Sequence, residues 1–341
     1  MDFNTKIDLD LLKKLCNAHG VSGYEDEVAD IIIDTIRDNC DTVMKDAVGN
    51  VIAFKKGKKT PQEPIMLCAH MDEVGFSVKH INDDGTLDFL EVGISPTILP
   101  SKRVLVGKDK IHGVISSRPI HLSSDKTRAV NLSDLVIDIG AKDKEEAKML
   151  GLFAEYAVFD SEFVLLGDGF VKAKALDDRI GCAVMCMLTQ CELEYDVYFA
   201  FTVGEELGGT GASAATNRIK PGISLILEGT TASDLHGYSE KDMVCRAGFG
   251  AVCPFMDGGT FYDNALYKKI LALARENNIK VQTKTKVAGG TDAARIQRTG
   301  KGSRVIAISL ACRYIHTGSS VAAIEDMNSI LRLTKLFLSS L

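Results

Sequence analysis

Residues 197–207, Val-Tyr-Phe-Ala-Phe-Thr-Val-Gly-Glu-Glu-Leu, decide the class of fold. The apolar part of this stretch, rich in β-branched and aromatic residues, predicts a strand that is covered on both faces. Carboxylates at the end of a buried strand are costly to desolvate unless a metal ion or another cation compensates them. Because adjacent side chains on an extended backbone point to opposite faces, we expect Glu205 and Glu206 to differ in role, one binding a metal and the other moving a proton.

The residues that follow this pair favour a functional interpretation, although two adjacent glutamates are most often solvated surface residues. Gly208-Gly209-Thr210-Gly211 comes next and leads into a short helix of small residues. A strand, an acidic turn and a helix in succession form the arrangement in which open α/β sheets bind ligands, outside the carboxyl ends of their strands.

The composition is that of an ordinary globular protein, and the length of 341 residues suggests roughly two domains. The formal net charge of −6 and the lack of a basic patch argue against nucleic acid or a membrane as the main partner, so we expect a small or peptidic one. The first residues lack the pattern of a secretory signal, and no apolar stretch is long enough to span a bilayer. The nine cysteines include no Cys-x-x-Cys pair. We therefore expect a cytoplasmic protein with reduced cysteines.

The order of predicted elements indicates an α/β chain interrupted by a β-rich insertion. The predicted elements are helices from about Asp8, Glu25 and Ala322 and over about 262–277, and strands at 51–54, 64–68, 197–203, 223–227 and 304–310. From about 76 to 166 the sequence has short strand-like runs broken by turn signals, with one charged helical stretch. We therefore predict an α/β catalytic domain made of residues 1–75 and 167–341, and a small inserted β-rich domain made of residues 76–166.

Five places put a metal-ligand type of residue at the end of an apolar run or in a Gly-rich turn. They are His70 with Asp72, Asp177 with Asp178, Glu205 with Glu206, Glu228, and His316. A single residue of this kind is more often a satisfied structural residue or a helix cap. Their repetition at predicted strand ends is what favours a shared site.

Two of these pairs keep a structural alternative. His70 and Asp72 share one face of an extended strand, so Asp72 can orient a metal-binding histidine, but it could also be a turn residue. One carboxylate of Asp177 and Asp178 could bridge two cations while Arg179 offsets the local charge. The same carboxylate could cap the helix that starts there, and the two roles can coexist.

His70 and His316, with Glu228 and one carboxylate from each of the pairs Asp177-Asp178 and Glu205-Glu206, make two histidines and three carboxylates. This donor set suits Zn²⁺, with Co²⁺ or Mn²⁺ as alternatives. One bridging carboxylate with two ligands on either side makes a site for two metal ions. Such a site activates a bound water molecule and polarises a carbonyl group, which suits hydrolysis of an amide or an ester.

Eight motifs occur in one order along nearly the whole chain. They are Gly20-Val21-Ser22-Gly23-Tyr24-Glu25, Asp46-Ala47-Val48-Gly49-Asn50, Ala69-His70-Met71-Asp72-Glu73-Val74-Gly75-Phe76, Lys174-Ala175-Leu176-Asp177-Asp178-Arg179-Ile180-Gly181, Gly204-Glu205-Glu206, Glu228-Gly229-Thr230-Thr231, Gly289-Gly290-Thr291-Asp292-Ala293 and Arg313-Tyr314-Ile315-His316. Together they resemble the tetrahedral metallo-aminopeptidases, the glutamyl- and deblocking-aminopeptidase family often labelled cellulase or endoglucanase M.

The resemblance implies a zinc-peptidase-like mixed sheet flanked by helices, and the removal of N-terminal residues from short peptides at two zinc ions. It assigns Asp177 as the bridging ligand, His70 and Glu228 to one ion, Glu206 and His316 to the other, Glu205 as general base and Asp72 as support for His70. The inserted domain would serve oligomerisation and restrict access. The family commonly forms hollow particles of twelve subunits, so we expect a homo-oligomer built from dimers, with the dodecamer as one form.

Four departures from the family pattern and one weak assignment qualify this picture. Glu228 stands where many relatives have Asp, which bears on metal distance, and Asp178 replaces a common Asn. Changes in residues 246–254 and in Thr317-Gly318 bear on side-chain preference more than on the chemistry. Thr291 and Asp292 are substrate-binding candidates by motif position alone, and Asp292 could instead cap the helix that follows it.

Two enzymatic rivals and one non-enzymatic rival remain. A metal-dependent N-deacylase would use the same water chemistry on an acyl-amino substrate. An endoglucanase, as the family label suggests, would need two carboxylates flanking a sugar, commonly with aromatic platforms, but this chain has no Trp and only 6% aromatic residues. A scaffold that has lost its site would lack ligands, whereas each expected type of ligand is present.

Overall fold

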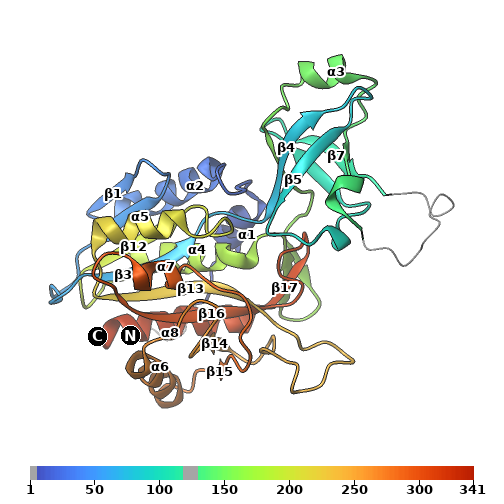
Figure 1. The fold of residues 1–341 in the computed structure, drawn as a ribbon. Coiled ribbons are helices and arrows are strands. Elements are labelled where there is room, and N and C mark those ends of the chain that lie inside the picture. Colours follow the sequence, from blue (N-terminus) through green and yellow to red (C-terminus); the bar gives the residue numbers. More distant parts are fainter. Residues whose placement is uncertain (1–5, 118–129) are drawn as a thin grey trace.

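The computed structural model describes residues 6–117 and 130–341, and an eight-stranded mixed sheet forms its centre (Figure 1). The strands, in spatial order, are β1 (Thr42–Lys45), β2 (Val51–Lys55), β12 (Val197–Thr202), β3 (Ile65–His70), β13 (Ile223–Thr231), β16 (Arg304–Cys312), β14 (Ala251–Cys253) and β15 (Val281–Thr283). The four central strands, β12, β3, β13 and β16, run parallel to one another. Their carboxyl ends therefore meet at one edge of the sheet.

Two groups of helices cover this sheet. The first group consists of α1 (Leu9–Asn17), α2 (Asp26–Ile36), α4 (Leu176–Thr189), α6 (Asn264–Glu276) and α8 (Ile324–Ser339), and α4 packs on β3 and β13. The second group consists of α5 (Thr210–Ile219), which packs on β12, and α7 (Ala293–Arg298), which packs on β13 and β16. Because both faces are covered, the central strands are apolar along their length. The predicted mixed sheet flanked by helices is confirmed.

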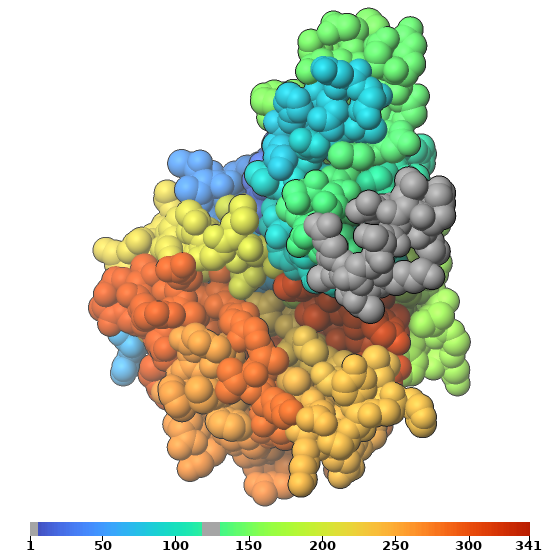
Figure 2. Space-filling view, turned by 45° about the vertical axis from the view of Figure 1, so that its right-hand side comes forward, coloured from blue at the N-terminus to red at the C-terminus, as the bar shows by residue number. Residues whose placement is uncertain are grey.

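A closed barrel projects from one end of the sheet and forms the separate lobe at the top of Figure 2. Its strands, in spatial order, are β4 (Gly75–Ile81), β5 (Leu87–Val92), β8 (Ile137–Asp138), β7 (Ile111–Ile115), β6 (Arg103–Val106) and β9 (Tyr156–Phe159), and α3 (Lys144–Met149) lies between β8 and β9 in the chain. The barrel has its own hydrophobic core, in which Phe76 meets Phe89 and Phe159 edge to face, each pair with ring centres 5.3 Å apart. Only four residues separate β4 from the end of β3, so the barrel lies next to the carboxyl edge of the sheet.

A third sheet is built from segments that all follow the barrel in the chain. It consists of β10 (Val164–Leu166), β11 (Phe170–Ala173) and β17 (Ser320–Ala323). β10 falls inside the predicted insertion of residues 76–166, yet it pairs with β11, and residues 118–129 of that insertion lie outside the described residues. The division into a catalytic domain and an inserted domain stays a prediction.

The structure differs from the sequence-based elements mainly at strand ends. β13 continues through Glu228 to Thr231, because its last residues pair with β16. β17 precedes the last helix, which begins at Ile324 and not near residue 322. All nine cysteines are free thiols, and most are buried. In the described part of the chain no helix has the length and apolar character needed to cross a membrane.

Candidate active site

Parallel strands bring the predicted metal ligands to one edge of the central sheet. His70 is the last residue of β3, and the turn that carries Glu205 and Glu206 follows β12. Glu228 lies within β13. His316 lies in the turn after β16, with a left-handed backbone conformation (φ 58°) that non-glycine residues rarely adopt. Four strands thus supply side chains to one place.

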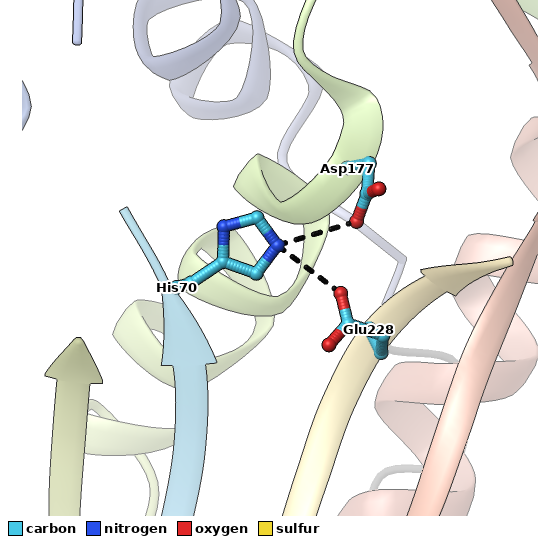
Figure 3. Close-up of side chains that lie close together, drawn as sticks. All are labelled: His70, Asp177 and Glu228. Carbon is cyan, nitrogen blue, oxygen red and sulfur yellow. Dashed lines mark hydrogen bonds and ion pairs between the residues drawn. The ribbon is translucent and has the colours of Figure 1, made fainter. Parts of the chain in front are cut away.

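His70, Asp177 and Glu228 form the first group of potential metal ligands (Figure 3). The Nε2 atom of His70 lies 3.4 Å from Oδ1 of Asp177 and 3.2 Å from Oε1 of Glu228. Figure 3 shows the two carboxylates pointing at the same ring nitrogen from α4 and β13. An imidazole with two carboxylates is a donor set that suits Zn²⁺ and related divalent ions.

His316, Glu206 and Asp177 form a second group on the other side of the same aspartate. The Nε2 atom of His316 lies 3.5 Å from Oδ2 of Asp177 and 3.5 Å from Oε1 of Glu206. The two oxygens of Asp177 therefore face different groups, Oδ1 the first and Oδ2 the second. The geometry suits one carboxylate shared between two cation positions.

Backbone and carboxylate groups orient both histidines through their other ring nitrogen. Nδ1 of His70 lies 3.1 Å from the backbone oxygen of Asp72 and 3.4 Å from Oδ1 of Asp72. Nδ1 of His316 lies 2.9 Å from the backbone oxygen of Gly93, in the segment that follows β5 of the barrel. Contacts of this kind set the ring orientation and the tautomer of a metal-binding histidine.

The Asp72 carboxylate also holds the acidic turn in place. It accepts hydrogen bonds from the backbone nitrogens of Glu205 (3.0 Å) and Glu206 (3.1 Å), and from the hydroxyl of Ser22 (2.6 Å). Asp72 is therefore more than a turn residue: its buried carboxylate contacts both His70 and the turn that carries Glu205 and Glu206. The sequence indicated the contact with His70 but not this second task.

Asp177 and Asp178 take different roles: one caps the helix, and the other is placed to bridge two cations. Asp178 is buried and accepts hydrogen bonds from the backbone nitrogens of Gly181 (3.0 Å) and His70 (3.2 Å), so it acts as the helix cap. Asp177 accepts from the backbone nitrogen of Gly229 (3.1 Å) and faces the two ligand groups. The cap and the bridge coexist because the two side chains point in different directions.

Arg179 does not offset the charge of Asp177 and Asp178, contrary to the sequence-based expectation. Its guanidinium lies 3.3 Å from Oε1 of Glu73, which Lys174 also contacts through Nζ at 2.6 Å from Oε2. The three side chains are buried, and both cations also donate to the backbone oxygen of Ala18. Glu73 lies three residues after His70, and Lys174 and Arg179 lie on either side of the first residue of α4. The cluster therefore links the end of β3 to the start of α4.

Crowding of buried acids shifts the pKa values of the site. Burial raises the pKa of Glu205 to about 8 and that of Glu206 to about 7, and it raises the pKa of Glu228 well above its usual range. Burial also acts to raise the pKa of Asp177, but interactions with His316 and His70 hold it well below its ordinary value. Divalent cations would remove the opposition to ionising these acids together, so the residues present fit bound metal ions.

Thr291 and Asp292 lie beside the acidic turn, and Asp292 does not cap the helix after it. The Asp292 side chain makes no capping hydrogen bond to α7; its Oδ2 accepts from the hydroxyl of Thr202 (2.7 Å) instead. The hydroxyl of Thr291 accepts from the backbone nitrogen of Ala293 (3.2 Å). The capping alternative for Asp292 is therefore wrong, and a direct contact of either residue with substrate stays a prediction.

Two cavities meet at Glu205. The first has a volume of about 300 Å³ and is lined by Asp177, Glu205, Glu228 and His316 together with Tyr262, Asp257, Lys284 and Thr291. The second, of about 470 Å³, lies beside the acidic turn and α7 and shares Glu205, Gly290 and Thr291 with the first. A larger cavity of about 890 Å³, lined by residues such as Arg103 and Lys172, contains none of the potential metal ligands. The first cavity is the candidate substrate site.

Known proteins with the word aminopeptidase in their names are similar to this chain over nearly its whole length. The sequence profile described as M42 glutamyl aminopeptidase matches residues 49–333. A putative aminopeptidase of Acetivibrio thermocellus is 36% identical over 327 residues, which cover 95% of this chain and 96% of the relative. The structure of an aminopeptidase from the archaeon Desulfurococcus kamchatkensis has a TM-score of 0.93 at 33% identity and covers 97% of this chain and 94% of its own.

A further similar structure bears on assembly. The TET1 peptidase of Pyrococcus horikoshii, which is described as able to assemble into a tetrahedron or a large octahedral shell, has a TM-score of 0.86 at 33% identity. The match covers 98% of this chain and 99% of that one.

Proposed function

We propose, because the chain belongs to the M42 family of glutamyl aminopeptidases, that it is a metallo-aminopeptidase that hydrolyses the N-terminal peptide bond of short peptides at a pair of metal ions. The aminopeptidase class follows from the family. The observation that supports two ions is the Asp177 carboxylate, whose oxygens face separate ligand groups.

The chain offers three ligands to each ion, with Asp177 shared. His70 and Glu228 complete one position, and His316 and Glu206 complete the other. Zn²⁺ suits this donor set best, and Co²⁺ or Mn²⁺ are alternatives. When bound, the ions supply Lewis acidity that polarises the scissile carbonyl and lowers the pKa of the attacking water.

Glu205 acts as the general base in this proposal. Its carboxylate lines the first cavity beside Asp177 and Glu228, where the scissile bond must lie to reach both ligand groups. It takes a proton from the attacking water and returns it to the leaving amine. Asp72 fixes the turn beneath it by accepting from the backbone nitrogen of Glu205.

The central test is a substrate panel run together with metal analysis. We expect the purified protein, loaded with Zn²⁺ or Co²⁺, to release amino acids from aminoacyl p-nitroanilides and unblocked peptides, and a chelator to remove most of this activity. Metal content measured on the same preparation should approach two ions per chain. No release from any aminoacyl substrate by the metal-loaded protein would refute the aminopeptidase assignment.

The same panel separates the rival activities. An N-deacylase would hydrolyse acetylated peptides in preference to free ones, and an endoglucanase would release reducing sugar from a β-glucan without a need for these metals. We expect neither, because the similar proteins described above are named as aminopeptidases. The proposed enzyme works as a homo-oligomer built from dimers, with the dodecamer as one form, for which the assembly of the TET1 relative is the support.

Lys284 supplies a cation to the first cavity. From its surroundings we expect a preference for substrates whose N-terminal residue has an acidic side chain. Its side chain is buried, its ammonium donates to the backbone oxygen of Ala288, and among residues 6–117 and 130–341 no carboxylate lies within 4.0 Å of it. Asp257 lines the same cavity, but its oxygens accept from Tyr262 (2.6 Å) and Gly259 (2.8 Å). An acidic side chain of the substrate would therefore find an ammonium that lacks a carboxylate partner.

We expect Lys284→Met to lower kcat/KM for glutamyl substrates by roughly 10- to 100-fold relative to leucyl substrates, the size expected for one charge-assisted contact. The ratio of the two kcat/KM values is the readout, so that a general loss of activity cancels. A native preference for lysyl over glutamyl substrates would contradict this and would point to Asp257 as the selecting group.

A further inference from the structure

The second cavity has no role in the function proposed above. Its volume of about 470 Å³ falls within the range of small-ligand sites, about 300–1,000 Å³. It lies where α7 meets the segment before α5, and these two helices contact each other. Because Glu205, Gly290 and Thr291 line both cavities, a molecule in the first can extend past Glu205 into the second.

Arg295 and Arg298 are the two cationic groups that line this second cavity, together with the carboxylates of Glu205, Glu206 and Asp292. They lie three residues apart on α7 and therefore on the same face of the helix. Nε of Arg295 donates to the backbone oxygen of Gly208 (2.7 Å), and Nε of Arg298 donates to the backbone oxygen of Ala294 (2.8 Å). A terminal nitrogen of Arg298 also donates to the backbone oxygen of Gly259 (3.4 Å). Together these bonds orient the guanidinium groups and still leave most of their N–H donors for a ligand.

Neither arginine has an acidic partner within 4.0 Å in the described part of the chain. Arg304, which is also exposed, shows the ordinary arrangement for this protein, because its guanidinium pairs with Asp263 at 2.7 Å. An arginine without a carboxylate partner in a cavity is a recognition group for a carboxylate, which it can bind through two parallel hydrogen bonds.

The chemistry of the reaction says which part of a peptide reaches this cavity. Glu205 must return its proton to the leaving nitrogen, so the departing part of the substrate lies on the side of Glu205 away from the residue that is released. The released residue occupies the first cavity with Asp177, Glu228 and His316. The departing part then extends into the second cavity, towards the arginines.

We propose that the second cavity binds the departing part of the substrate and that Arg295 and Arg298 bind its free C-terminal carboxylate. The enzyme would thus select short peptides whose C-terminus is free and within reach of α7. This inference rests on the aminopeptidase function and on Glu205 as its general base, and it adds a substrate class, short peptides with a free carboxylate, to that function.

An alternative role for the arginines is electrostatic. Asp292 lines the same cavity, one of its oxygens has no hydrogen-bond partner in the described part of the chain, and burial raises its pKa to about 6. Arg295 and Arg298 could therefore serve to balance Asp292, Glu205 and Glu206 and bind nothing. In that case their loss would affect all substrates alike, with or without a carboxylate.

The test compares peptides of two, three and four residues as free acids and as C-terminal amides, all with the N-terminal residue that the panel identifies as best. In the wild type we expect kcat/KM for the free acid to exceed that for the amide by about tenfold at one or more lengths, a moderate figure because both arginines are exposed. Arg298→Gln and Arg295→Gln should bring this ratio towards one, mainly through KM. Arg298→Lys should keep part of it, since charge remains without the planar fork.

Arg304→Gln is the matched control, because it removes an exposed arginine at the start of β16, the end of that strand away from His316. It should keep the wild-type ratio of kcat/KM for the free acid to that for the amide. A wild-type ratio of one at every length would overturn the inference, as would equal losses for acid and amide in the two arginine variants. An aminoacyl p-nitroanilide, which has no C-terminal carboxylate, shows whether a negative result concerns the inference alone or the aminopeptidase function as well. If it is cleaved, the aminopeptidase function stands even when the inference falls; if nothing is cleaved, both fall.

Discussion

Glu205→Gln is expected to lower kcat by about 10²- to 10⁴-fold while the protein keeps its full content of metal. The amide has nearly the size of the carboxylate but cannot accept a proton from water and return it to the leaving amine. The turn should stay in place, because Asp72 holds it through backbone nitrogens that the substitution leaves unchanged. The measurements are kcat with the best p-nitroanilide and metal content by elemental analysis.

Glu276→Gln, at the exposed C-terminal end of α6, is the matched control and should behave as the wild type. Two outcomes would contradict the role of Glu205. Activity within tenfold of the wild type would mean that another group moves the proton. Loss of metal would mean that Glu205 is a metal ligand. The structure allows this second role, because Glu205, Glu206 and His70 also form a group with ligand atoms within 4.8 Å of one another.

Asp177→Asn should abolish activity and weaken both metal positions. Oδ1 of Asp177 lies 3.4 Å from Nε2 of His70, and Oδ2 lies 3.5 Å from Nε2 of His316, so that one carboxylate serves both groups. Asparagine is neutral and has a single oxygen, so it cannot serve both. Since loss of a residue that only orients a ligand costs about 10- to 100-fold in affinity, loss of the shared ligand should cost more at each position.

Titration of the metal-free protein with Zn²⁺ checks this expectation, and Glu206→Gln is the comparison. Glu206 belongs to one position only, so its amide variant should weaken one binding step and spare the other. Retention of one tight ion in Asp177→Asn would show that the aspartate is not shared. A parallel titration of Glu228→Asp asks whether a shorter carboxylate side chain binds as well as Glu228 does.

Much of the site was accessible from the sequence because the cost of placing charge beside a buried strand is local. The apolar run at 197–203 predicts a covered strand, and Glu205 and Glu206 at its end predict a partner for their charge. The structure confirms the strand and brings the acids together with His70 and His316. The roles of these residues as ligands and base stay predictions.

Other parts of the site depend on residues far apart in the chain. The backbone oxygen of Gly93 meets His316 across 223 positions, and nothing in either local pattern indicates this contact. Arg179 illustrates a wrong expectation: proximity in sequence suggested Asp177 and Asp178 as its partners, but packing against α1 turns it towards Glu73. Neighbours in a sequence often diverge in space when the backbone turns between them.

The order of strands and acidic turns, the types of donor atom and the chemistry they suit follow from the sequence, because hydrophobic periodicity and the desolvation of charge act over a few residues. The tertiary structure decides the directions in which the side chains point and therefore which groups they contact. It assigns the two oxygens of Asp177 to different groups, makes Asp178 the cap, and leaves Arg295 and Arg298 without acidic partners beside a second cavity in the described part of the chain. These features arise from the packing of distant segments around one edge of a sheet, and a linear pattern of residue types does not encode which way a side chain points there.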